Sequence, residues 1–311
     1  MSAVATDTPK QDVVRSRGDR VFGAVVTGSG SLILVVLAGV AIFLLAKAEP
    51  AITASAADLP GGEGLVDYIA PLVFGSVLAA FIAIVIAVPF ATAVALFITF
   101  YAPKKLAQPL SYVIDLLAAI PSIIYGLWGI AVLGTASYST QLWLEEHLGF
   151  IPFFEGPASS TGRTMLVVGI VLAVMILPII TAVAREVFSQ TPRMHREGAL
   201  ALGATRWEMI KMTVLPFGKS ALISGSMLGL GRALGETMAV AIILSVSGAV
   251  TFNLISSGNP STIAADIALA FPESSGLAIN TLITSGLVLF AITLVVNMAA
   301  RAIIGRSQPA V

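Results

Sequence analysis

Only 11% of the 311 residues are charged, 57% are hydrophobic, and the mean hydropathy is +0.96. A soluble domain carries about 25% charged residues, so this composition indicates a membrane protein. The formal net charge of zero excludes a strongly basic nucleic-acid-binding protein. The chain has no cysteine, which excludes disulfides, zinc–thiolate sites and thiol nucleophiles.

The N-terminal part predicts a tail followed by a span. Residues 1–20 are polar and partly basic, and we expect them to form a disordered cytoplasmic tail. The apolar run at residues 21–46 is longer than the core of a cleaved signal sequence, about 7–15 residues, so we interpret it as an uncleaved first span.

Five further runs are long and apolar enough to cross a membrane, at residues 68–103, 106–134, 164–184, 214–246 and 274–300. The predicted fold is an all-α polytopic membrane protein with six transmembrane helices. With the N-terminus in the cytoplasm, most of the 17 lysines and arginines fall in inner segments and only Lys47 and Arg163 in outer ones. This asymmetry places both termini in the cytoplasm. The outer segments 140–150 and 261–272 are expected to form short helices, which either cap the spans or contact an external partner.

A patterned cytoplasmic segment, residues 192–216, lies between the fourth and fifth predicted spans. Pro192 can begin a helix because its missing N–H costs nothing in the first turn. Gly203 occupies the place of a helix C-terminal glycine, and a second helix is expected to begin near Thr205. A short helix outside the bilayer, joined to two spans, would move both spans when a partner pushes on it.

Two opposite charges lie inside the predicted fifth span. Arg232 follows Lys219 by 13 residues, which is roughly 20 Å along a helix, within a core about 30 Å thick. A lipid-exposed charge at this depth costs from about 3 to over 10 kcal/mol, so the pair must face the interior or water. In a continuous helix Arg232 and Glu236 share one face.

Two interpretations of this pair remain open. It can be a structural salt bridge that locks two helices. It can also be an oxyanion contact on a transport path, where the arginine supplies a fork of donors and Glu236 neutralises Arg232 when the path is empty. Glu236 would then accept a hydrogen bond from hydrogen phosphate that sulfate cannot donate. Small residues around the pair allow close helix packing and leave room for a narrow path, namely Gly225, Gly229, Gly231 and Gly235.

Asp115 in the third predicted span is a third candidate. It either pairs with a cation of this or a neighbouring chain, or lies in a solvated cytoplasmic vestibule. Pro121 is expected to interrupt the same span, because proline removes a backbone donor and kinks a helix. Ser122 is expected to satisfy a carbonyl freed by this break.

The cytoplasmic segment resembles the coupling pattern of ABC importer permeases, E-A-A-x3-G-x9-I-x-L-P, which docks into the ATPase subunit. The chain departs from the pattern at Gly198, which replaces an alanine, and at Thr213, which replaces the isoleucine. Two further segments, AIPSIIYGLWG at 119–129 and GLGRALGETMAV at 229–240, resemble the membrane subunit of phosphate ABC importers. The matching coupling positions are Glu197, Gly198, Ala199, Gly203, Leu215 and Pro216.

The resemblance implies a MetI-like permease core at residues 68–304, preceded by an extra N-terminal span, in a bacterial plasma membrane. It implies that Arg232 and Glu236 line the translocation path, and that the partners are the sister permease PstA, a dimer of the ATPase PstB and the phosphate-binding protein PstS. The chain itself is then a pore subunit rather than an enzyme and binds no cofactor, with ATP and magnesium held by the partner ATPase. The sequence Gly218-Lys219-Ser220 is no P-loop, because position 213 lacks the required glycine.

Three alternatives remain. A sulfate or molybdate permease would share the fold and the coupling segment. An ATP-independent anion carrier would explain the buried charges but not the patterned inner segment, and the sequence shows no inverted repeat. A membrane enzyme is disfavoured, because His147 and His195 fall on opposite sides of the membrane and the chain has no H-E-x-x-H motif.

Overall fold

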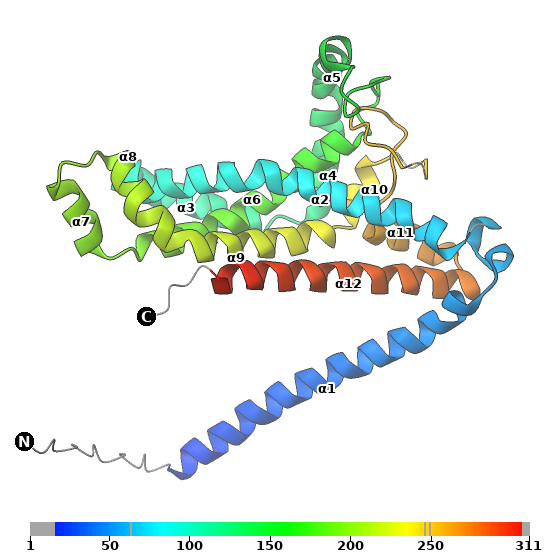
Figure 1. Ribbon diagram of the computed structural model, residues 1–311, viewed down its shortest axis with the longest axis horizontal. Helices are drawn as coiled ribbons and strands as arrows, with labels where there is room; N and C mark the ends of the chain where they lie inside the picture. Colours follow the sequence, from blue (N-terminus) through cyan, green and yellow to red (C-terminus); the bar gives the residue numbers. More distant parts are fainter. Residues whose placement is uncertain (1–15, 63, 246, 249, 307–311) are drawn as a thin grey trace, which may run out of the picture. The chain divides into compact units, whose positions relative to one another are not determined.

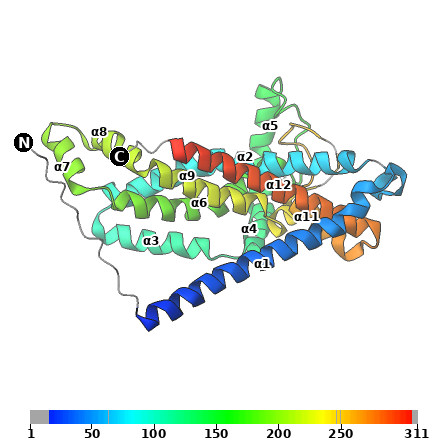
Figure 2. The same ribbon diagram turned by 60° about the horizontal axis from the view of Figure 1, so that its bottom comes forward.

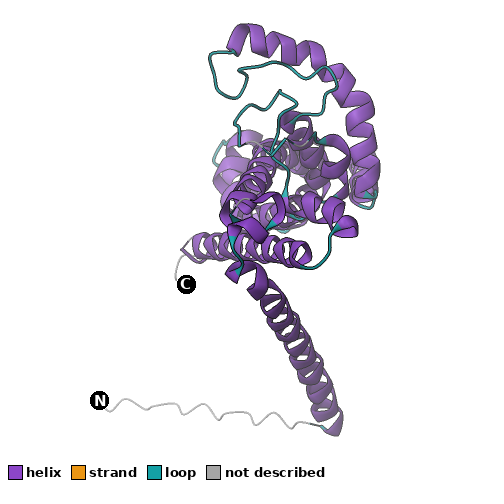
Figure 3. Cartoon of the chain, turned by 90° about the vertical axis from the view of Figure 1, so that its right-hand side faces the viewer, coloured by secondary structure: helices purple, strands orange, loops and turns teal. Residues whose placement is uncertain are grey.

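The computed structural model describes residues 16–62, 64–245, 247–248 and 250–306. Every regular element in these ranges is a helix, which confirms the all-α class (Figure 3). The chain divides into two compact units, residues 1–47 and 48–311. Residues 1–15 of the expected tail lie outside the described residues.

The first unit contains most of helix α1 (Arg17–Thr53), which is long and apolar enough to cross a membrane. It includes the predicted span 21–46 but begins earlier, within the expected tail. The reason is a reciprocal cap: the Ser16 N–H donates to the Asp19 carboxylate (2.9 Å), and the Asp19 N–H donates to the Ser16 hydroxyl (3.2 Å).

In the second unit, four long helices run alongside one another (Figures 1 and 2). They are α2 (Leu65–Leu96), α6 (Met165–Ser189), α9 (Leu215–Leu234) and α12 (Leu277–Arg306). Alanines at four-residue spacing form one face of α2 and are buried, which lets α6 approach closely. These alanines are Ala79, Ala83, Ala87, Ala91 and Ala95. Most of these alanines share a buried apolar cluster with side chains of α6, which include Leu172, Ile176 and Ile180.

The remaining helices are shorter. They are α3 (Lys104–Ala118), α4 (Ser122–Trp128), α5 (Thr135–Leu148), α7 (Arg193–Ala201), α8 (Arg206–Met209), α10 (Met238–Ile243) and α11 (Ile263–Ala270). Helices α7 and α8 lie at the opposite end of the α2, α6 and α9 bundle from α11 (Figure 1). Helices α5 and α11 confirm the helices expected at 140–150 and 261–272.

Four helices of the described chain are long and apolar enough to span a membrane: α1, the helix from Leu65 to Tyr101, α6 and α12. Helix α3 and the helix Ser122–Leu148 would form a fifth span, bent by 95° at the break. Helix α9 is not among them, because its glycines, serines, Lys219 and Arg232 lower its mean hydropathy. A multi-pass membrane protein is therefore confirmed, and the count of six spans stays a prediction.

Helix α11 is held against the start of α2. The Ile263 N–H donates to the Ser76 hydroxyl (2.9 Å), and the Tyr68 hydroxyl donates to the Asp266 carboxylate (2.7 Å). Gly75 is required here, because a Cβ at this position would lie 2.2 Å from the Ser261 carbonyl oxygen. These contacts fix α11 on the bundle that carries the candidate site.

Candidate anion site and coupling surface

The predicted fifth span is broken between its two charges. Helix α9 ends at Leu234, and α10 begins at Met238. The expectation of one continuous helix over 214–246, with Arg232 and Glu236 on a shared face, is therefore wrong. Residue 246, at the end of that range, lies outside the described residues.

Each charge lies at a helix end that favours its sign. Glu236 Oε1 accepts a hydrogen bond from the Ala239 N–H (3.1 Å), which satisfies a free donor in the first turn of α10. Arg232 lies in the last turn of α9, where the helix dipole favours a cation. Glu236 is 7% exposed and Arg232 is half-buried. Within the described residues, no ion pair joins these two side chains.

The glycines of α9 divide into two kinds. Gly225 and Gly229 face α6, since an added Cβ would lie 3.1 Å from Val183 Cβ or 3.0 Å from Ile180 Cδ1. Gly231 and Gly235 are exposed, and a Cβ at Gly231 would meet nothing within 4 Å. The first pair therefore serves helix packing, and the second pair leaves an open face beside Arg232 and Glu236.

Tyr125 joins this region, although the sequence analysis assigned it no role. Its hydroxyl donates to the Leu117 carbonyl (2.8 Å), so Tyr125 rather than Ser122 satisfies an acceptor at the end of α3. Tyr125 is 6% exposed. The available signal was a tyrosine four residues after Pro121, the expected helix break.

Helix α4, which contains Tyr125, is in direct contact with α10. A Cβ at Gly126 would lie 2.8 Å from Ala239 Cα, so the two backbones are in contact at this point. Ala239 is the residue whose N–H Glu236 binds. The break between α3 and α4 and the break between α9 and α10 are thus connected. Paired helix breaks of this kind form substrate sites in transporters.

Asp115 pairs with a cation of its own chain. Its Oδ1 lies 3.6 Å from Nη2 of Arg185, and the two side chains are 52% and 23% exposed. Arg185 belongs to α6, one residue beyond the predicted span 164–184. Both charges border an open polar pocket of about 440 Å³ between α3 and α6. The expected pairing with a cation is therefore present within this chain, and the pair borders an open pocket, whereas its place in a cytoplasmic vestibule stays a prediction.

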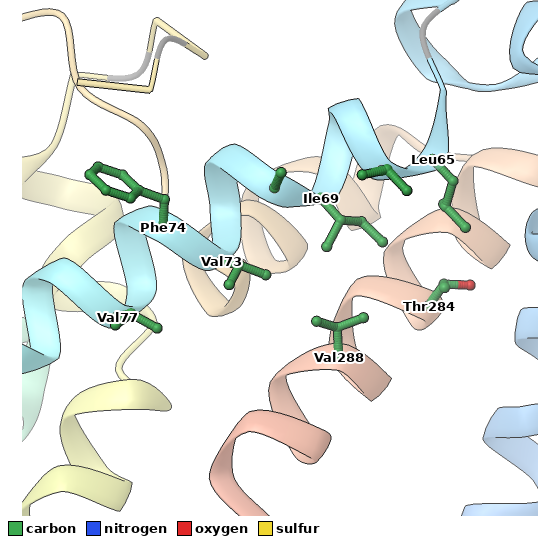
Figure 4. Close-up of a pocket in the computed structure, with 9 residues that line it drawn as sticks. Leu65, Ile69, Val73, Phe74, Val77, Thr284 and Val288 are labelled. Atoms are coloured by element: carbon green, nitrogen blue, oxygen red, sulfur yellow. The ribbon is translucent and has the colours of Figure 1, made fainter. Parts of the chain in front are cut away.

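A second cavity, between α2 and α12, has a different character (Figure 4). It measures about 600 Å³ and is lined by Leu65, Ile69, Val73 and other apolar side chains, with Thr284 its one hydroxyl-bearing residue. The Thr284 hydroxyl donates to the Asn280 carbonyl (2.8 Å) of its own helix. This cavity offers no charge to an anion, so the candidate site is the one at Arg232.

The coupling segment forms the two helices that its sequence predicts. Gly203 follows α7 with φ +88°, a conformation that favours glycine. The Gly203 N–H donates to the Leu200 carbonyl (3.0 Å), and the Ala204 N–H donates to the Ala199 carbonyl (3.2 Å). These are the two hydrogen bonds of a Schellman cap. Thr205 then begins α8.

Thr205 and Glu208 form a capping box at α8. The Thr205 N–H donates to Glu208 Oε2 (2.8 Å), and the Glu208 N–H donates to the Thr205 hydroxyl (3.3 Å). The hydrogen bonds from the Thr205 backbone and side chain hold the pKa of Glu208 below its usual range. The box therefore fixes the turn between α7 and α8 most firmly while Glu208 is ionised.

A small apolar cluster joins the coupling segment to the ends of the long helices. Ala199 and Ile210 pack with Phe188 of α6 and Leu96 of α2. The Arg196 guanidinium lies 5.8 Å from the centre of the Phe100 ring, a cation–π contact. These contacts anchor α7 to the bundle at several points.

The outward side of α7 is exposed and partly apolar. Met194 is 85% exposed and Leu202 is 91% exposed, although both are large hydrophobic residues. Glu197 and Gly198 are also exposed, and a Cβ at Gly198 would meet nothing within 4 Å. The glycine that departs from the coupling pattern is therefore sterically free to be alanine. Leu215 and Pro216, the last residues of the pattern, begin α9.

Residues 87–311 match the family model described as binding-protein-dependent transport system inner membrane component. The chain belongs to this family. Within it, the chain is 45% identical over 301 residues to the phosphate transport system permease protein PstC 2 of Mycobacterium tuberculosis, covering 93% of this chain and 92% of the relative. PstC of Mycobacterium leprae is 46% identical over 277 residues (85% and 86%), and PstC of Xylella fastidiosa strain 9a5c is 38% identical over 309 residues (95% and 94%).

Solved structures share the fold. A chain of a bacterial ABC transporter involved in the import of the acidic polysaccharide alginate aligns with TM-score 0.62 and 15% identity, covering 94% of this chain and 98% of that chain. A chain of the MetNI methionine ABC transporter, in an inward-facing conformation, aligns with TM-score 0.56 and 14% identity, covering 78% and 97%. These likenesses confirm an ABC importer permease fold for the chain.

Proposed function

We propose that this chain is the membrane permease subunit of an ATP-driven phosphate importer. The observation that carries the proposal is a half-buried Arg232 at a helix break, beside an exposed glycine face, in a chain 45% identical over nearly its full length to a phosphate permease. A guanidinium presents a fork of donors that suits a tetrahedral oxyanion. Glu236 lies four residues on and would keep anion binding weak enough for release.

The subunit would work within a larger assembly. We infer that a sister permease, PstA, completes the path, that a dimer of the ATPase PstB hydrolyses ATP, and that PstS delivers phosphate from outside. The exposed Met194 on α7 and Leu202 directly after it support an intracellular partner at this surface. Both termini would then lie in the cytoplasm, with lipid around the spans. We propose no nucleotide or metal site in this chain, because ATP and magnesium belong to the partner.

The mechanism would be alternating access. ATP binding closes the two ATPase subunits, and α7 of this chain moves with the ATPase it contacts. Because α7 shares an apolar cluster with the ends of α2 and α6, this movement tilts those helices. Phosphate released by the binding protein then passes Arg232 toward the cytoplasm.

Reconstitution with these partner subunits tests the proposal. Vesicles that hold the complete assembly should take up phosphate when ATP is supplied, and a tenfold excess of sulfate should compete poorly. Uptake of sulfate in preference to phosphate would contradict the substrate assignment. Phosphate uptake without ATP would contradict the importer class.

The role of Glu236 in selectivity needs its own comparison. Hydrogen phosphate can donate a hydrogen bond to a carboxylate and sulfate cannot, so Glu236→Gln should reduce the preference for phosphate. The glutamine carbonyl oxygen can still accept the Ala239 N–H, which preserves the cap of α10. An unchanged ratio of phosphate to sulfate uptake would remove Glu236 from the selectivity mechanism.

A further inference from the structure

Tyr125 lies where two interrupted helices meet. Its hydroxyl spans the interruption between α3 and α4, donating to the Leu117 carbonyl at 2.8 Å. The side chain is 6% exposed, so this hydroxyl is held within the protein. A buried hydroxyl that loses its hydrogen-bond partner stays desolvated, which costs free energy. The conformation that keeps the bond to Leu117 is therefore favoured.

Gly126, the residue after Tyr125, contacts the helix that begins at the candidate anion site. A Cβ at Gly126 would lie 2.8 Å from Ala239 Cα, so α4 and α10 touch backbone to backbone. The Ala239 N–H is in turn bound by Glu236. A shift of α4 relative to α3 would therefore move the first turn of α10 and the carboxylate that caps it.

We propose that Tyr125 is a positioning residue, whose hydroxyl bond to Leu117 fixes the angle between α3 and α4 and thereby the place of Glu236 at the start of α10. This inference rests on the proposed function for its transport consequence. Tyr125 acts through α4 and α10 and needs no contact with the transported anion.

The end of α3 is also joined by an ion pair to α6, the helix that leads to the coupling segment. Asp115 lies two residues before Leu117 and pairs with Arg185 of α6 at 3.6 Å. Helix α6 continues to Ser189, and α7 begins at Arg193. The last turn of α3 is thus held between the helix that leads to the coupling segment and the tyrosine that positions Glu236. Because the pair is half-exposed, its energy is small and its effect should be weaker than that of Tyr125.

Tyr125→Phe tests the inference in the reconstituted assembly, because it removes one oxygen atom and keeps the ring. Tyr112→Phe is the matched control on α3: Tyr112 is exposed, and its hydroxyl accepts a hydrogen bond from Gln108 of the same helix at 3.0 Å. The first readout is amide hydrogen exchange of residues 238–243, which requires no substrate. Loss of one neutral hydrogen bond should speed this exchange about three- to tenfold in Tyr125→Phe, and leave it unchanged in Tyr112→Phe.

The second readout is the number of phosphate ions taken up per ATP hydrolysed. A variant that is only less stable loses uptake and ATPase activity together, so the ratio stays constant. Tyr125→Phe should lower the ratio, Asp115→Asn should lower it less, and the double variant should lose less than the two single losses combined. Strictly additive losses would show that Asp115 and Tyr125 act independently.

The two proposals fail in different ways. If the wild-type assembly takes up no phosphate, the proposed function fails, while the exchange of residues 238–243 still decides whether Tyr125 positions α10. If the wild-type assembly is active but Tyr125→Phe changes neither the exchange nor the ratio, the positioning role is overturned alone.

Discussion

The coupling segment and the broken fifth span are both built from short helices separated by caps, yet only the first follows its sequence closely. Helices α7 and α8 begin and end where Pro192, Gly203 and Thr205 predict. In the fifth span, Arg232 and Glu236 were expected on one continuous helix; instead Arg232 lies in the last turn of α9 and Glu236 lies in the break before α10. The difference arises because the apolar periodicity of a span hides local stop signals, whereas a polar segment displays them.

Those signals were present in the sequence. Arg232, Gly235, Glu236 and Thr237 form the order expected at a helix end followed by a helix start: a cation in a last turn, a glycine, then an acidic and a hydroxyl residue. In water such a break costs little, because solvent binds the free backbone groups. In a membrane the free backbone groups need partners within the protein. The Glu236 carboxylate is such a partner, because it accepts a hydrogen bond from the Ala239 N–H.

The largest effect is expected from Arg232→Gln, which removes the charge at the break. A charged hydrogen bond contributes about 1.5–3 kcal/mol, so ATP-driven phosphate uptake should fall on the order of 10- to 100-fold. Arg163→Gln changes an exposed arginine in the segment before α6 and should leave uptake unchanged. Equal losses in the two variants would show that the effect is not specific to the break.

The two kinds of glycine on α9 give the next test. Gly229→Leu places a side chain against Ile180 and should destabilise the protein by about 1–3 kcal/mol, measured as thermal unfolding in detergent. Gly231→Leu meets open space, so it should keep wild-type stability in the isolated chain but lose most uptake in the assembly. If Gly231→Leu transports normally, the open face is not part of the path.

Substitutions in the coupling segment should have smaller effects. Gly203→Ala puts a Cβ at φ +88°, which costs about 1–2 kcal/mol and should weaken co-purification of the ATPase. Gly198→Ala is the control, because the added methyl group is sterically free and alanine favours a helix. Weaker co-purification with Gly198→Ala alone would contradict the assignment of Gly203 as the cap.

The smallest effect concerns pH. Because the pKa of Glu208 is lowered in the folded protein, the capping box contributes its stability above the usual pKa of glutamate and loses it as the pH falls through the lowered value. Amide exchange protection of residues 206–209 should therefore decrease in acid. Glu208→Gln should abolish this pH dependence, because glutamine does not ionise, and a dependence that persists in Glu208→Gln would have another origin.

The fold class and the helices α7 and α8 could be predicted because they depend on composition and on residues within a few positions of one another. The contact of Gly126 with Ala239 joins residues more than a hundred positions apart, and a single sequence gives no signal for it. The pairing of Asp115 with Arg185 also joins residues far apart in the sequence, so a single sequence does not identify the partner. Tyr125 was overlooked because its partner, Leu117, is a backbone carbonyl, which no side-chain pattern marks.

The central claim is that Arg232 and Glu236 border a water-accessible route at the break of the fifth span. Thiol accessibility tests it most directly, because the chain contains no cysteine and each single replacement reports alone. In the assembled importer, Gly231→Cys and Gly235→Cys should react with a charged, membrane-impermeant thiol reagent applied to both sides, and phosphate delivered with the binding protein should slow the reaction. Gly225→Cys and Gly229→Cys, on the face that packs against α6, should not react. The claim would be contradicted if all four cysteines were equally unreactive.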